Sequence, residues 1–64
     1  MNDYAKAVRD RLGKGDCWFV RRGKGDHDIW RSPYTEIPFT VPTSIKSRHT
    51  ANKIMKDAGL KKAF

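Results

Sequence analysis

The spacing of apolar residues changes twice along this 64-residue chain, and this change constrains the fold more than any other feature. Near both ends, apolar side chains recur every three or four residues, which is the spacing of one helix face. Between them lie three short runs rich in aromatic and β-branched residues and bounded by turn-forming residues, which is typical of strands. The sequence therefore predicts two helices and three strands in the order α-β-β-β-α.

Both helices are predicted from their apolar stripes and from the residues at their ends. Asn2 or Asp3 can cap a first helix that runs to about residue 12, where Gly13 ends it. The second helix begins near Ser47. The stripes comprise Tyr4, Val8 and Leu12 in the first helix and Ala51, Ile54, Met55 and Ala58 in the second, which Gly59 follows.

The three predicted strands lie between the helices. They comprise Cys17–Arg22, His27–Ser32 and Glu36–Val41. The turn Gly23–Asp26 joins the first two. The third alternates strictly, so Ile37, Phe39 and Val41 should face one side of the sheet. Because proline has no amide hydrogen to donate, Pro38 indicates that this strand lies at an edge of the sheet or begins there.

Together these elements predict an α+β fold with a three-stranded antiparallel sheet and two helices on one face. The chain is short enough to form a single domain, 1–64. Double-stranded-RNA-binding domains share this architecture. Only 38% of the residues are hydrophobic, so the core must be thin. The last four residues, 61–64, are expected to be loose.

The charge of the chain narrows the choice of partners. Fourteen lysine and arginine residues stand against seven acidic residues, which gives a net charge of +7. In so small a domain this excess favours a polyanion or an acidic protein as partner. Seven aromatic residues argue against the alternative of a disordered charged segment.

The cysteine content and the lack of long apolar runs predict a cytoplasmic protein. Cys17 is the single cysteine, so no internal disulfide can form, which fits a reducing compartment. Its surroundings lack the spacing of a metal site, and we interpret it as a small apolar strand residue. The sequence shows neither a signal-peptide pattern nor an apolar run of about 20 residues, the length of a membrane span.

The candidate for chemistry is His27, which directly follows the basic glycine-rich turn. Histidine is the side chain whose unperturbed pKa allows it to act as acid or base near neutrality. Arg22 and Lys24 lie close to it in sequence and can hold phosphates. RNA carries its own nucleophile, the 2′-hydroxyl, so a protein that cleaves it must mainly move protons and stabilise charge. The alternative interpretation is that His27 is an exposed residue of a basic binding surface and has no catalytic role.

The order and spacing of these residues resemble the core motif of HicA-type toxins, small messenger-RNA-cleaving members of toxin–antitoxin pairs. The resemblance covers about residues 4 to 60. The matching positions are Trp18, Arg22, Gly25, His27, Val41, Pro42, Thr50, Ala58, Gly59 and Leu60. The chain departs from the family pattern at Asp26, where the family has a serine, and at Cys17, where it has a glycine.

The resemblance implies an endoribonuclease that acts on mRNA and is neutralised by a HicB-like antitoxin in a heteromeric complex. His27 would be the general acid/base. The candidates to bind RNA phosphates are Arg22, Lys24, Gly25, Lys46 and Arg48. We expect cleavage without metal or other cofactor, because Asp26, His27 and Asp28 alternate in direction along a strand and chelate poorly.

Several alternatives remain open from the sequence. His49 could supply a second histidine, although a solvated residue at the start of a helix is more usual. Ile29 and Trp30 cannot both face the helices, and Trp30 could stack on a base or cover a neighbouring strand or the antitoxin. Trp18 is expected in the core, and Phe39 or Trp30 could anchor the antitoxin. The rival functions are a non-catalytic RNA-binding module and an adaptor for an acidic protein.

Overall fold

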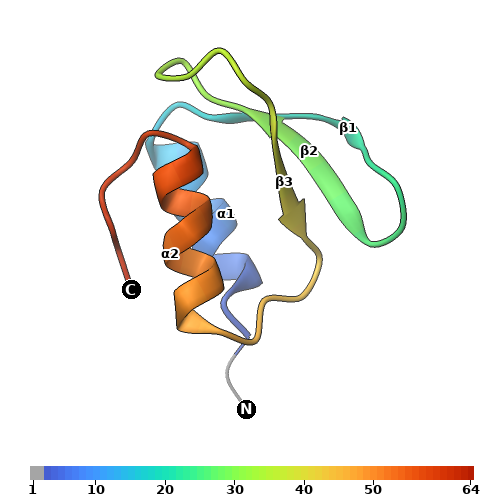
Figure 1. Cartoon of the computed structure of the whole chain (residues 1–64), viewed down its shortest axis with the longest axis vertical. Coiled ribbons are helices and arrows are strands. Elements are labelled where there is room, and N and C mark those ends of the chain that lie inside the picture. The colour runs from blue at the N-terminus through green and yellow to red at the C-terminus, as the bar shows by residue number, and fades with distance from the viewer. Residues whose placement is uncertain (1–2) are drawn as a thin grey trace.

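A computed structural model describes residues 3–64 and has the predicted order of elements (Figure 1). The elements are α1 (Ala5–Lys14), β1 (Trp18–Arg22), β2 (His27–Arg31), β3 (Phe39–Pro42) and α2 (Arg48–Asp57). The strands pair in the order β1-β2-β3, and both pairs are antiparallel. Both helices lie on one face of the sheet, so the predicted architecture is confirmed. Neither described helix is long and apolar enough to cross a membrane.

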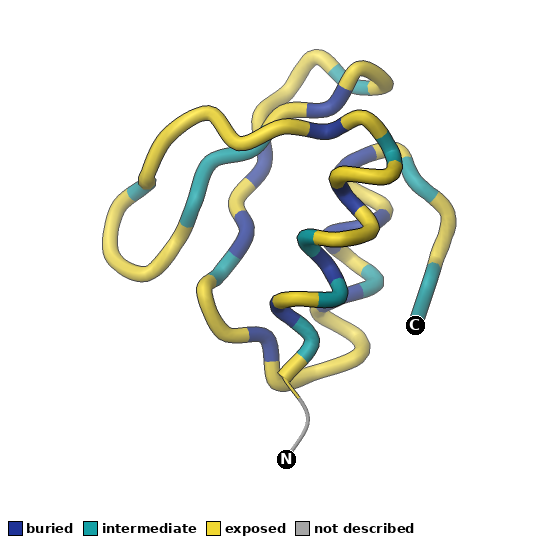
Figure 2. The backbone as a smooth tube through the Cα atoms, turned by 180° about the vertical axis from the view of Figure 1, so that it is seen from behind, coloured by how far each residue is buried: buried dark blue, intermediate teal, exposed yellow. Residues whose placement is uncertain are grey.

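The core lies between the two helices and β3, and both predicted apolar stripes contribute to it (Figure 2). The largest fully buried side chains are Val8, Leu12, Val41, Ile45 and Met55. Ser32 is the buried polar residue of this region, and its hydroxyl donates to the carbonyl of Ala58 at 2.6 Å. That hydrogen bond joins the segment after β2 to the end of α2.

The ends of α1 differ in detail from the prediction. Asp3 accepts a hydrogen bond from the Ala5 amide at 2.9 Å, whereas Asn2 lies outside the described residues. The helix continues through Gly13 and ends at Lys14, two residues later than expected. Asp16, with φ 67°, is the residue that adopts the left-handed conformation after the helix. Gly13 therefore does not end α1, because the chain reverses only after it.

The ends of α2 are as predicted. The Ser47 side chain accepts a hydrogen bond from the Thr50 amide, which satisfies one of the free donors of the first turn. Gly59 has φ 75°, and its amide donates to Lys56 while the Leu60 amide donates to Met55. This pair of bonds is the Schellman arrangement that a glycine allows at a helix end.

The third strand is shorter than predicted. It spans Phe39–Pro42, where Phe39 and Val41 are buried, while Ile37 is 76% exposed. The prediction that Ile37 shares the buried face is therefore wrong. Pro38 directly precedes the strand, and β3 pairs on one side only, so its expected position at an edge is confirmed.

The first strand projects past the helices and is exposed at every residue (Figures 1 and 2). Trp18 is 47% exposed, so its expected place in the core is wrong. The register between β1 and β2 shifts between Phe19 and Arg21, so Val20 is the extra residue of a bulge. Phe39 and Val41 of β3 are buried, unlike any residue of β1, and Cys17 is the residue of the predicted first strand that is buried.

The C-terminal segment is also better ordered than expected. It runs back beside α2 (Figure 1), where the Asn52 side chain donates to the Phe64 carbonyl and accepts from the Phe64 amide, both at 2.9 Å. The Phe64 ring meets that of Tyr4 edge to face, with centroids 5.7 Å apart. The expectation of loose residues at 61–64 is therefore wrong, because these long-range contacts hold the segment.

Candidate functional site

His27 is the first residue of β2, and two glycines of the preceding turn place it there. The Gly23 amide donates to the His27 carbonyl at 2.7 Å, and a Cβ on Gly23 would lie 2.9 Å from that oxygen. Gly25 has φ 67°, which side chains other than glycine rarely adopt. On the other side, the Thr43 amide donates to the Asp26 carbonyl at 2.8 Å. The backbone around His27 is thus fixed from both neighbouring segments.

The strand register places His27 on the open face of the sheet. Directly paired residues of antiparallel strands share a face. Asp28 pairs with Val41, which is buried beneath the helices, so its neighbour His27 lies on the opposite face with its own partner Pro42. His27 is exposed there, where a large substrate can reach it.

An ion-pair cluster lies directly beside His27 on the helix side of the sheet. The Asp28 carboxylate lies 3.2 Å from Arg9 Nη2 and 3.2 Å from Arg22 Nε, and its side chain is 13% exposed. Arg9 Nη2 also donates to the Pro42 carbonyl at 3.1 Å, which ties α1 to the end of β3. The Arg22 side chain contacts Asp28 through Nε and remains 67% exposed. Asp28 therefore holds one end of a guanidinium that is otherwise open to an anion.

The structure divides the predicted phosphate-binding residues into two groups. Arg22, Lys24 and Gly25 lie with His27 in the β1–β2 hairpin, and Gly25 contributes its turn conformation. Lys46 and Arg48 lie instead around the start of α2. Lys46 Nζ is 3.3 Å from the Asp3 carboxylate, so its charge is already partly balanced. The hairpin group lies closest to the histidine along the chain, but Arg22 pairs with Asp28 and so lies on the helix side of the sheet, opposite His27.

Asp3 is the acidic residue whose ionisation the fold changes most clearly. The amides of Ile45 and Ala5, followed by Ser44 and Lys46, donate to its carboxylate and hold its pKa well below the usual range. Hydrogen bonds to the charged form lower a carboxyl pKa in this way. Asp3 therefore stays ionised and fixes the loop before α2 to the start of α1.

Trp18 lies outside the core, where it was not expected, and the strand pairing decides the face of Trp30, which the sequence left open. Trp30 pairs with the buried Phe39 and so lies on the helix side, where its ring meets Phe19 edge to face with centroids 6.3 Å apart. Trp18 pairs with Arg31 and lies on the open face with His27. The aromatic side chain available for stacking on the open face is thus Trp18, not Trp30. Phe39 is buried and cannot serve as an exposed anchor.

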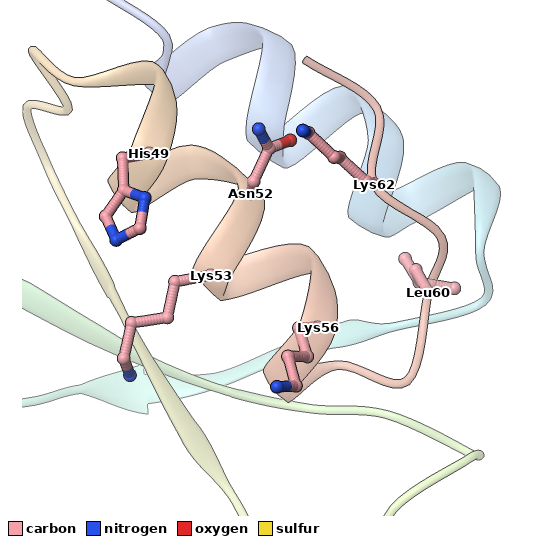
Figure 3. Close-up of a pocket in the computed structure, with 6 residues that line it drawn as sticks. All are labelled: His49, Asn52, Lys53, Lys56, Leu60 and Lys62. Carbon is pink, nitrogen blue, oxygen red and sulfur yellow. The ribbon is translucent and has the colours of Figure 1, made fainter.

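His49 lies in the first turn of α2 and belongs to a different surface. It lines a pocket of about 530 Å³ formed by α2 and the C-terminal segment (Figure 3). The lining residues are His49, Asn52, Lys53, Lys56, Leu60 and Lys62. His27 is not among them, so this pocket does not unite the two histidines.

Sequence reasoning missed Arg9 and the role of Asp28. Arg9 carries no local signal in the sequence, because its contacts with Asp28 and Pro42 span 19 and 33 positions. Asp28 carried a usable signal, since it is an acid inside a basic hairpin and alternates with His27 along the strand. Within residues 3–64, no three histidine, cysteine or acidic residues gather as a metal site would require.

Comparisons with models of protein families, with curated proteins and with solved structures give no match for this chain. A function must therefore be inferred from the residues of the site itself.

Proposed function

We propose that this protein is a cytoplasmic endoribonuclease toxin of the HicA type, which cleaves mRNA and is neutralised by a HicB-like antitoxin. The observation that carries the proposal is the placement of His27. It is an exposed histidine, fixed by its backbone on the open face of the sheet, where Arg21 also lies, and it follows the basic turn that carries Lys24. This arrangement combines a proton-transfer group with cations that can bind phosphate.

The reaction that suits these residues is attack of a 2′-hydroxyl on the adjacent phosphorus. A base takes the 2′-hydroxyl proton as the 2′-oxygen bonds to phosphorus, and an acid protonates the 5′-oxygen as its bond breaks. The products are a 2′,3′-cyclic phosphate and a free 5′-hydroxyl. His27 would perform one of these proton transfers, which typically accelerates a reaction by about 10²–10⁴-fold, and water can complete the other.

Lys24 would stabilise the negative charge that grows on the phosphoryl oxygens, and Arg22, on the helix side of the sheet, would hold a neighbouring phosphate of the same strand. Arg22 contacts Asp28 through Nε at 3.2 Å, which restrains its guanidinium before the substrate arrives. A restrained cation loses less conformational entropy when it binds a phosphate. Asp28 would thus act as a positioning residue, since it contacts the arginine and not the RNA.

The antitoxin would need to cover the basic hairpin. The exposed edge strand offers it apolar contacts at Trp18, Phe19 and Val20, next to the cations Arg21 and Arg22. An acidic surface with apolar anchors is the complement of this strand. Opposite charges speed association, and buried anchors lengthen the lifetime of a complex.

The alternative function is an RNA-binding module without catalysis. One observation favours this RNA-binding function. Trp18 and Arg31 form a cross-strand pair on the open face of the sheet, next to Arg21. Such a surface can stack a base and hold phosphates without any need for His27.

Product analysis separates the two functions. Purified protein is incubated with a transcript in the presence of a chelator, beside the same sequence with 2′-O-methyl groups, which lacks the nucleophile. The nuclease should leave 2′,3′-cyclic phosphate ends on the first RNA and leave the second intact. Binding of both RNAs with cleavage of neither would establish the RNA-binding module instead.

A further inference from the structure

The pocket beside α2 is distinct from the His27 site and has its own basic lining. His49, Lys53 and Lys56 are spaced four and three residues apart, so they share one face of the helix. Figure 3 shows their side chains on that face, with Lys62 reaching toward Asn52 from the C-terminal segment. Three lysines and one histidine thus line a single depression.

The C-terminal segment, which forms the wall of the pocket that carries Lys62, is held in place at both ends. The two hydrogen bonds between Asn52 and Phe64 close the far end of the segment against α2. At the near end, the Leu60 side chain lies over Gly15, where a Cβ would come within 2.7 Å of it. The backbone of this wall is therefore held at both ends, which lowers the cost of ordering it on binding.

The charge of this region is not balanced from within. The stretch 48–64 contains five lysine and arginine residues and a single acid, Asp57. Asp57 pairs with Lys53 at 3.3 Å, and both side chains are well exposed. Lys56 and Lys62 form no ion pair with any part of the chain that the structure describes. Like charges held close together favour the uptake of an anion.

We propose that this pocket is a second contact for the phosphates of the RNA strand, outside the site of cleavage. Lys53, Lys56 and Lys62 would hold one or two phosphates, and His49 would donate a further hydrogen bond. This inference rests on the proposed function, because that function identifies the ligand as RNA. The surface that it assigns to RNA binding is separate from the His27 site. The longest dimension of the molecule is 33 Å. A strand in helical geometry rises roughly 3.4 Å per nucleotide, so about ten nucleotides match this length, and a strand of about twelve would pass from the open face of the sheet round to α2.

The test compares binding of 2′-O-methyl RNAs of two lengths, which cannot be cleaved. The double variant Lys53→Gln/Lys56→Gln removes two pocket charges, and the control Lys6→Gln/Lys14→Gln removes two charges from α1. Binding of RNAs of about twelve and about three nucleotides is measured between about 0.05 and 0.2 M salt, where phosphate contacts give a strong salt dependence.

We expect the pocket variant to bind the long RNA on the order of tenfold more weakly, with a salt slope shallower by about 1.4, since each phosphate contact contributes about 0.7 for single strands. The short RNA should bind the pocket variant and the control alike. Equal binding of the long RNA by the pocket variant and the control would overturn this inference and leave the proposed function untouched. If the unaltered protein binds neither RNA, the proposed function fails, and this inference fails with it.

Discussion

Asp28 is the residue on which most of the candidate site depends. It lies between two guanidiniums from different elements, Arg9 of α1 and Arg22 of β1, and its side chain is largely removed from water. The Arg9 contact is a hydrogen bond, whereas the Arg22 contact is an ion pair without hydrogen-bond geometry. A buried carboxylate is tolerated only when its charge is balanced in this way. Removing its charge would in turn leave two arginines close together without their counter-ion.

We predict that Asp28→Asn lowers the free energy of unfolding by about 1.5–3 kcal/mol, the usual value of a hydrogen bond to a charged group. RNA cleavage should also fall, because Arg22 loses the carboxylate that restrains its guanidinium and holds the RNA less well. Urea denaturation and a cleavage assay on folded protein measure the two effects. The matched control is Asp57→Asn, which removes an exposed pair with Lys53 and should cost less than about 1 kcal/mol. Equal stability losses in the two variants would refute the role given to Asp28.

At the scale of elements, the start of α1 and the loop before α2 are joined through one carboxylate. Asp3 accepts hydrogen bonds from Ala5 at the helix start and from Ile45 in the loop, and it also pairs with Lys46. The Tyr4 amide donates to the Ile45 carbonyl at 2.7 Å, so the backbone reinforces the same connection. This connection sets the position of Lys46 and of the α2 start.

The connection predicts a pH dependence of stability. Because the folded pKa of Asp3 is lowered, its contribution is fully present above its unfolded pKa of about 3.9 and is lost as the pH falls toward the folded value. The stability difference between the unaltered protein and Asp3→Asn should therefore be largest near neutral pH and shrink below about pH 4. Urea unfolding of both proteins at several pH values measures this. A difference that stays constant with pH would show that the charge of Asp3 is not what stabilises the connection.

The C-terminal segment gives a second prediction at this scale. Asn52→Ala removes both hydrogen bonds to Phe64, which should cost about 1–3 kcal/mol at the usual 0.5–1.5 kcal/mol for each. Amide hydrogen exchange in residues 61–64 should become faster at the same time. Thr50→Ala, an exposed change in the same helix, serves as the control. Unchanged exchange in the Asn52 variant would mean that the Phe64 ring alone holds the segment.

These elements also show what the sequence could and could not reveal. The start and end of α2 were predictable, because Ser47 and Gly59 act through bonds to residues a few positions away. The exposure of Trp18 was not, since it depends on a bulge at Val20 and on which strands the helices happen to cover. The same holds for the candidate site. The turn before His27 could be predicted from its glycines, whereas the contact of Arg9 with Asp28 could not, because it spans 19 positions.

For the whole molecule, the thin core and the net charge of +7 fit a protein that binds a polyanion. Two helices and β3 supply most of the buried side chains, which leaves the β1–β2 hairpin free to carry exposed functional groups. The hairpin and the pocket beside α2 are then two surfaces on one small scaffold. The proposed reaction takes place at the hairpin, so the proposed function depends first on His27.

The most direct measurement is the rate of RNA cleavage by His27→Ala under single-turnover conditions, together with its affinity for uncleavable RNA. The control is Thr40→Ala, an exposed residue on the same face of the sheet. We expect His27→Ala to remain folded, to bind RNA nearly as well as the unaltered protein and to cleave it about 10²–10⁴-fold more slowly, while Thr40→Ala should cleave normally. Cleavage by folded His27→Ala at the rate of the control would contradict the central claim that this histidine is the catalyst.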